Sequence, residues 1–273
     1  MSHGVVKLWI TGLVAAAAGV ALAVTAMPVS SQAPRAAIPR TADGKPNLNG
    51  IWQTLSTANW DLEPHAAAPS PVLALGAAGA IPPGLGVVQG GPIPYLPEAL
   101  NRKKENAKNW LTADPEVKCY LPGVPRATYM PHPFQIVQSR NVILIAYQYA
   151  SASRTIPLKA RTEGAAVDTW MGDSVGRWDG DTLVVDSESF NDSTWFDRAG
   201  NYHSGALRVV ERYTPIDANI IQYEATIEDP KVFSRPWTIR MPIYRHVETN
   251  AQLIEFKCVE FVEELMYGHL RKK

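Results

Sequence analysis

The densest group of polar side chains in the sequence lies between Asn191 and Glu211. This segment carries one histidine, His203, together with the carboxylates Asp197 and Glu211. A histidine titrates near neutral pH and a carboxylate can orient its ring, so such a set is suited to general acid–base catalysis. We predict His203 as the proton-transfer group, with Asp197 or Glu211 as its partner. The alternative is that Asp197 shapes a turn by bonding its own backbone and that His203 is a structural residue.

A second set of residues is suited to holding a small molecule. Arg177 lies beside Trp178 in an expected strand and near Asp173. If this charged pair faces inward, it can bind the polar end of a ligand, because a buried charge must be paired. The alternative is a salt bridge that fixes the hairpin. The expected ligand-binding residues are Asp173, Arg177, Trp178, Trp195, Tyr202, Arg126 and Arg154, with Trp170 as a further aromatic wall.

The sequence lacks the motifs of several common site types. It has no phosphate loop, GxSxG, HExxH or GxGxxG, and Gly84-Leu85-Gly86 lacks the third glycine of a dinucleotide site. The histidines stand at no metal-ligand spacing. We therefore expect no metal and no cofactor. The 26 Lys+Arg and 26 Asp+Glu residues balance, which argues against a nucleic-acid partner.

The elements that must position these residues are mostly strands. From Phe134 onward, apolar residues alternate with polar ones, the period of a half-buried strand. We predict a mainly β fold, an antiparallel meander of eight or nine strands that closes into a lipocalin-like barrel. Short helices are expected at Glu98–Trp110 and Val262–Leu270. The expected strands cover residues 134–138, 141–149, 175–178, 182–187, 207–213, 220–228, 237–244 and 253–261.

One turn has a strong signature of its own. Asp179-Gly180 separates two of the expected strands, and both residue types tolerate positive φ. This pattern predicts a type I′ hairpin turn at these two positions.

The N-terminal residues 1–33 have the pattern of an export signal. Lys7 precedes an apolar run from Leu8 to Ala26, and small-residue cleavage sites follow. The alternative is an uncleaved membrane anchor. We expect a cleaved signal, a periplasmic or secreted location, and no membrane contact by the mature chain.

The mature chain is expected to have two parts, an arm over residues 34–110 and a β-barrel domain over residues 111–273. Residues 64–97 of the arm contain no Asp, Glu, Lys or Arg and are rich in Ala, Gly and Pro. Prolines interrupt every regular element there. We expect an ordered arm or lid that lies on the barrel or on a partner, including a second copy of the chain.

The two cysteines, Cys119 and Cys258, both lie in the mature part. In an oxidising compartment such a pair predicts one disulfide. The alternative is two buried free thiols.

Several segments together resemble an uncharacterised family of exported bacterial β-rich proteins. They are Asp114–Cys119, Pro122–Arg126, Pro133–Gln138, Gly172–Asp186 (GDSVGRWDGDTLVVD) and His203–Tyr213. Gly50-Ile51-Trp52 also resembles the GxW of the first lipocalin strand. The resemblance implies export and a β-rich fold, but no reaction.

Two classes of function follow from these observations. The first is a barrel that binds a small apolar or aromatic ligand, with the arm as a lid. The second is a cofactor-independent enzyme on the same barrel, a lyase, isomerase or hydrolase, that uses the His203 pair. The third is a purely structural surface protein whose arm docks a partner.

Overall fold

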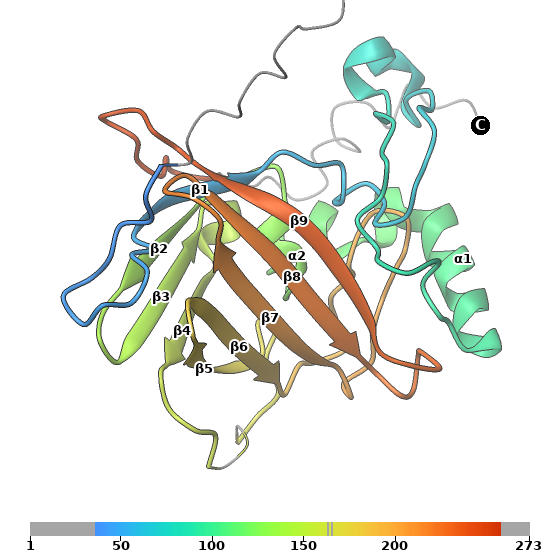
Figure 1. Cartoon of the computed structure of the whole chain (residues 1–273). Coiled ribbons are helices and arrows are strands. Elements are labelled where there is room, and N and C mark those ends of the chain that lie inside the picture. The colour runs from blue at the N-terminus through green and yellow to red at the C-terminus, as the bar shows by residue number, and fades with distance from the viewer. Residues whose placement is uncertain (1–35, 163, 165, 258–273) are drawn as a thin grey trace, which may run out of the picture. The chain divides into compact units, whose positions relative to one another are not determined.

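The computed structural model describes residues 36–162, 164 and 166–257. Nine antiparallel strands form one sheet that is nearly closed into a barrel, so the predicted fold class is confirmed (Figure 1). The strands are β1 (Gly50–Thr54), β2 (Phe134–Gln138), β3 (Val142–Tyr147), β4 (Ser153–Pro157), β5 (Asp173–Asp179), β6 (Thr182–Glu188), β7 (Arg208–Pro215), β8 (Ile220–Glu228) and β9 (Trp237–Arg245). Around the barrel they follow the order β4-β3-β2-β1-β9-β8-β7-β6-β5.

The two ends of this order, β4 and β5, meet at a seam. Because every hydrogen-bonded pair in the sheet is antiparallel and the number of strands is odd, β4 and β5 run in the same direction. A single parallel bridge between Leu158 and Gly176 links them, in place of the antiparallel ladders found between the other neighbouring strands. The backbone therefore leaves the barrel nearly, rather than fully, closed.

The strand β1 comes from the segment that we expected to be part of the arm. It pairs with β2 on one side and with β9 on the other, and so joins the second and the ninth strands of the sequence. Trp52 in β1 is buried, donates its indole N–H to the Leu48 carbonyl at 2.8 Å, and carries the Arg245 guanidinium over its ring at 4.1 Å. The barrel therefore needs a strand from outside residues 134–261, the range in which we expected it to lie.

Two details at the ends of expected hairpins are corrected. The strand expected at 253–261 is wrong over residues 253–257, which form no strand; residues 258–261 and the expected helix 262–270 lie outside the described residues. The β5–β6 hairpin exists, but its loop is Gly180-Asp181, because Asp179 pairs with Thr182. Gly180 has a φ of +59° and Asp181 has no positive φ, so a type I′ turn is excluded and a glycine in the first position suits type II′.

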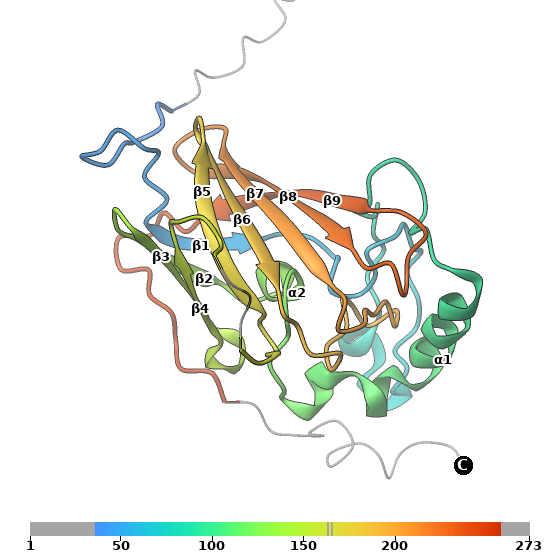
Figure 2. The same ribbon diagram turned by 90° about the horizontal axis from the view of Figure 1, so that it is seen from below.

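The arm and the longest helix lie together on one side of the barrel (Figure 2). The expected helix is α1 (Pro97–Ala113), and it begins with proline at its first turn, where no backbone N–H is needed. The arm doubles back on itself through the His65–Gly84 and Ala68–Ile81 bridges, and then Val88 bridges to Ile239 in β9. The arm is thus seated on the barrel. The remaining helical elements are α2 (Arg126–Tyr129), η1 (Leu73–Gly79), η2 (Pro115–Lys118) and η3 (Tyr149–Ser151).

Within the described part of the chain, no helix has the length and apolar character needed to cross a membrane.

Candidate functional site

The expected catalytic pair of His203 and Asp197 is not formed. His203 is buried, and its Nε2 lies 2.6 Å from the hydroxyl of Thr194. Its Nδ1 lies 2.9 Å from the backbone carbonyl of Ser204. Burial lowers the pKa of His203, which favours the neutral ring. With both ring nitrogens in hydrogen bonds to structural groups, His203 has the role of a packed core residue.

Asp197 is used to hold the arm to the loop between β6 and β7. Its carboxylate accepts hydrogen bonds from the Leu62 N–H at 2.9 Å and from the side chain of Asn201 at 2.6 Å. Burial, and then the charge of Asp61, raises the pKa of Asp197 to about 7 in spite of these donors. Asp197 is fully buried. It is therefore a titratable structural group with no contact to His203.

The third expected catalytic residue, Glu211, lies inside the barrel in an ion pair with Arg154, one of the expected ligand-binding residues. Arg154 Nη2 donates to Glu211 Oε2 at 2.6 Å, and both side chains are at most 2% exposed. The hydroxyls of Tyr213 and Tyr223 both donate to Glu211 Oε1 at 2.9 Å. With both carboxylate oxygens occupied by donors, Glu211 is not available as a base.

Arg154 also crosses the seam of the barrel. It extends from β4 and donates to Ser174 in β5 at 3.1 Å and to Ser187 in β6 at 3.0 Å, while Glu211 lies on β7. These side-chain bonds link strands that the backbone joins only weakly at β4 and β5. The Arg154–Glu211 pair is thus an internal tie of the barrel.

The other expected ligand-binding residues are dispersed. Arg177 is exposed, and Asp173 pairs with Arg161 instead of Arg177. Trp178 lies beneath Lys45, and Trp170 packs against Tyr120. Trp195 is buried in the core, and Tyr202 lies under α1, donating to the Ala99 carbonyl at 3.2 Å. These aromatic side chains do not share one site.

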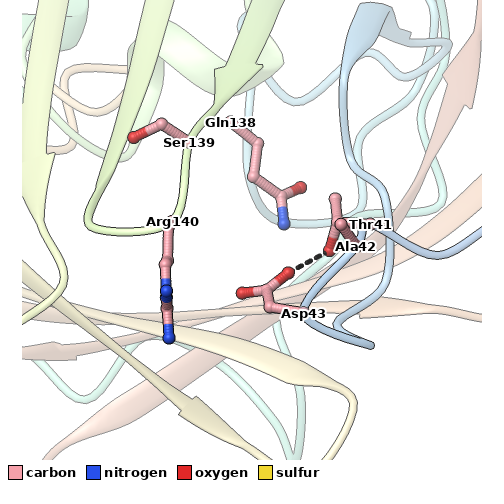
Figure 3. A pocket seen from close by; sticks show the side chains of 6 residues that line it. All are labelled: Thr41, Ala42, Asp43, Gln138, Ser139 and Arg140. Carbon is pink, nitrogen blue, oxygen red and sulfur yellow. Dashed lines mark hydrogen bonds between the residues drawn. The ribbon is translucent and has the colours of Figure 1, made fainter.

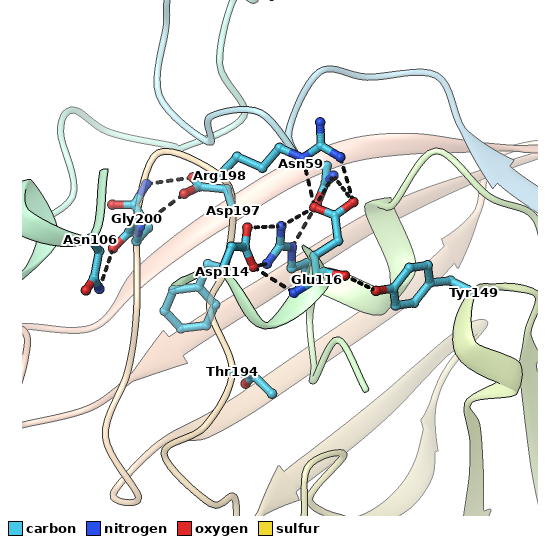
Figure 4. Close-up of polar contacts among 12 residues, drawn as sticks. Asn59, Asn106, Asp114, Glu116, Tyr149, Thr194, Asp197, Arg198 and Gly200 are labelled. Carbon is cyan, nitrogen blue, oxygen red and sulfur yellow. Dashed lines mark hydrogen bonds and ion pairs between the residues drawn. The ribbon is translucent and has the colours of Figure 1, made fainter. Parts of the chain in front are cut away.

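Arg126 lies in a different buried group, the Arg126 cluster, which contains Asn59, Asp114, Glu116, Arg126 and Arg198 (Figure 4). Arg126 binds Asp114 through two nitrogens, at 2.7 and 2.9 Å, and donates to Glu116 at 2.7 Å. Its Nε donates to Asn59 at 2.8 Å. Arg126 is 1% exposed and all three of its nitrogens are engaged, so it cannot bind a ligand directly.

Glu116 carries the connection from this cluster to the surface. It accepts two hydrogen bonds from Arg198, from Nε at 2.8 Å and from Nη2 at 2.9 Å. Burial raises the pKa of Glu116, but the charges of Arg126 and Arg198 outweigh burial and lower it to about 2. Glu116 is therefore a carboxylate at any physiological pH, and it fixes the plane of the Arg198 guanidinium.

The fixed face of Arg198 forms one wall of a cleft outside the barrel, which we name the tryptophan cleft. The guanidinium carbon lies 4.3 Å from the centre of the Trp60 ring and 5.2 Å from that of Trp110. The two indoles meet edge to face at 5.8 Å. The cleft has a volume of about 260 Å³, and its lining is Trp60, Asp61, His65, Ala66, Ala68, Ile81, Ala107, Trp110, Arg198 and Ala199.

No protein-family model, curated protein or solved structure matches the chain.

Two further polar residues line the tryptophan cleft. Asp61 accepts a hydrogen bond from the Glu63 N–H at 2.9 Å, and burial raises its pKa. His65 Nδ1 lies 2.9 Å from the Glu63 carbonyl, so it carries the hydrogen and leaves a lone pair on Nε2. That Nε2 is buried and has no hydrogen-bond partner among the described residues. The cleft is thus lined by one fixed cation, one carboxylate and one imidazole beside two indoles.

A larger cavity, of about 370 Å³, lies between the 41–45 loop and the β2–β3 turn (Figure 3). Its polar groups are mostly used by these loops themselves: Thr41 donates to Asp43, and Ser139 donates to the Val142 carbonyl. Arg140 faces the cavity, but no aromatic side chain lines it. A third cavity, of about 260 Å³, lies at the β8–β9 connection around Asp229, which bonds Ser204. We regard the tryptophan cleft as the better candidate, because two indole rings line it together with a fixed cation, a carboxylate and an imidazole.

The described residues contain no group of three or more His, Cys, Asp or Glu side chains that could hold a metal ion. Cys258 lies outside the described residues, so the Cys119–Cys258 disulfide stays a prediction.

Sequence reasoning did not single out the residues of the cleft. Trp60, Asp61 and His65 belong to the arm, Trp110 to α1, and Arg198 to the β6–β7 loop. Two signals pointed toward them: the expected role of the arm as a lid, and the density of polar residues around Arg198.

Proposed function

We propose that this protein binds a small molecule with a single aromatic ring in the tryptophan cleft, and that the barrel and the arm serve to position that cleft. Binding is favoured over acid–base catalysis because the expected His203–Asp197 pair is not formed.

The observation that carries the proposal is the setting of Arg198. Its Nε and Nη2 are held by Glu116, whereas Nη1 has no hydrogen-bond partner among the described residues. The side chain is 20% exposed, so this nitrogen remains accessible. A guanidinium that is both stacked and fixed offers a flat, rigid wall at little entropic cost. An aromatic ring fits against this wall and the two indoles.

The size of the cleft limits the ligand. Its volume of about 260 Å³ lies below the roughly 300–1,000 Å³ typical of pockets for drug-sized ligands. Small side chains, Ala66, Ala107 and Ala199, line it between the larger groups. One substituted ring is therefore a better fit than a fused polycyclic molecule.

Isothermal titration with benzyl alcohol tests the proposal. We expect saturable binding at one site, lost in Trp110→Ala and in Ala107→Leu, which fills the cleft from α1. The matched control is Trp178→Ala, a half-buried tryptophan on β5 whose ring lies beneath Lys45. If no binding is seen, or if the three variants bind equally well, the cleft is not the ligand site.

We further propose that the protein is exported and that residues 1–33 are removed. Mass determination of the mature chain from the producing cell tests this: a mass that still includes residues 1–33 would contradict it.

A further inference from the structure

The charges around the tryptophan cleft do not cancel. Within the Arg126 cluster, Arg126 pairs with Asp114 and Arg198 pairs with Glu116, so two cations meet two anions. Asp61 lines the same cleft and forms no ion pair among the described residues. Lys103 on α1 lowers the pKa of Asp61 through its charge, but it forms no ion pair with that carboxylate in the described part of the chain. Asp61 is thus the carboxylate of the cleft without a paired cation.

The cleft also has acceptors without donors. One oxygen of Asp61 accepts from the Glu63 N–H, and the other has no partner among the described residues. The buried Nε2 of His65 is likewise an acceptor without a donor. A bound donor can supply the hydrogen bond that such an acceptor lacks.

The aromatic walls favour the same sign of charge. The faces of indole rings attract cations. Arg198 already stacks on Trp60, but its positive charge is balanced by the ion pair with Glu116. It therefore does not offset the negative charge of Asp61.

We infer that the ligand is a protonated amine carried on a single aromatic ring, with its ammonium group bound by Asp61 and its ring against Trp60 and Trp110. An ammonium group has three donors and no acceptor, which matches the Asp61 oxygen that has no partner among the described residues. This inference rests on the proposed function, since it assigns the class of ligand for the same cleft.

Three probes that share one ring separate the possibilities. Benzylamine is a cation at pH 7, benzyl alcohol is neutral, and benzoate is an anion. We expect isothermal titration to show benzylamine binding at least tenfold more tightly than benzyl alcohol, and benzoate more weakly than either. Asp61→Asn should weaken benzylamine binding at least tenfold, a much larger loss than it causes for benzyl alcohol. The asparagine oxygen can still accept from Glu63 N–H, so the loop should stay folded, which circular dichroism checks.

The control is Glu105→Gln, which removes an exposed carboxylate of α1 that pairs with Lys108 outside the cleft. It should leave all three affinities unchanged. If benzyl alcohol binds and benzylamine binds no better, the cleft binds aromatic rings but the inferred preference for a protonated amine is wrong. If benzoate binds most tightly, the site recognises anions through Arg198 and the inference is overturned. If no probe binds, the proposed function fails with it.

Discussion

Replacing Glu211 by glutamine tests whether the Arg154–Glu211 pair holds the barrel together. The glutamine oxygen can take the place of Oε1 and still accept from Tyr213 and Tyr223. Its amide nitrogen then faces Arg154 Nη2, which lies 2.6 Å from the carboxylate oxygen that it replaces. Two donors meet there, and a guanidinium that is 2% exposed loses its counter-charge.

The magnitude follows from this burial. Removing one partner of a buried ion pair costs about 3–5 kcal/mol of stability. For a domain of this size the melting temperature should fall by roughly 6–20 °C. The double variant Arg154→Met, Glu211→Gln removes both charges and should recover at least half of the loss, because no unpaired charge remains.

Urea unfolding followed by tryptophan fluorescence and circular dichroism measures these values. The control is Glu224→Gln on the neighbouring strand β8, where Glu224 pairs with Arg240 on the outside of the barrel with side chains 23% and 53% exposed. It should cost at most about 1 kcal/mol, as exposed pairs do. If Glu211→Gln costs no more than Glu224→Gln, or if the double variant is as unstable as the single one, the pair does not tie the barrel.

Three further predictions concern the loop and the cleft. Asp197 has a pKa of about 7 in the folded chain against 3.8 for an ordinary aspartate. Its contribution to stability is therefore fully present below about pH 3.8 and is lost as pH rises through about 7, a total of about 4 kcal/mol. In urea unfolding from pH 4 to 8, the unfolding free energy of the parent chain relative to Asp197→Asn should fall by about this amount. A methyl group at Gly84 would collide with Thr57 Oγ1 and His65 Cε1, so Gly84→Ala should weaken benzylamine binding at least threefold. Gly205→Ala is the control, because Gly205 has room for the methyl group and the affinity should not change. If the two variants bind benzylamine equally well, His65 is not part of the site. His203→Ala removes a buried ring and leaves the Thr194 hydroxyl unpaired, so it should cost about 2–4 kcal/mol in urea unfolding but leave the affinity for benzyl alcohol unchanged; a loss of affinity in the folded variant would return His203 to the site.

The periodicity of the sequence predicts the strands well, because side chains along a strand point alternately into the barrel and out to solvent. In β8 the alternation of Ile221, Tyr223 and Ala225 with polar residues matches the buried positions of the structure. The same rule places Glu211 inside the barrel, between Val209 and Tyr213 on β7. A carboxylate at such a position must have a partner.

The identity of that partner is not contained in the local pattern. Arg154 lies on β4, whose sequence Ser-Arg-Thr-Ile-Pro is too short and polar to read as a strand. The strand β1 is difficult to predict for another reason: its partner strands β2 and β9 lie far from it in the sequence. The tryptophan cleft draws its residues from three separate segments, so only the fold brings Trp60, Trp110 and Arg198 together.

The pairing of β1 with β9 sets the order in which the barrel can be built. Trp52 pairs with Arg245, and the adjacent His246 side chain lies 2.9 Å from the Gln53 amide oxygen, 193 positions earlier. Contacts this distant in sequence form late and slow folding, because a long loop must be closed first. The strands β1–β4 and the strands β5–β9 join into one sheet only through the ladder between β1 and β9. We therefore expect the barrel to form from two open sheets, in a late step that pairs β1 with β9.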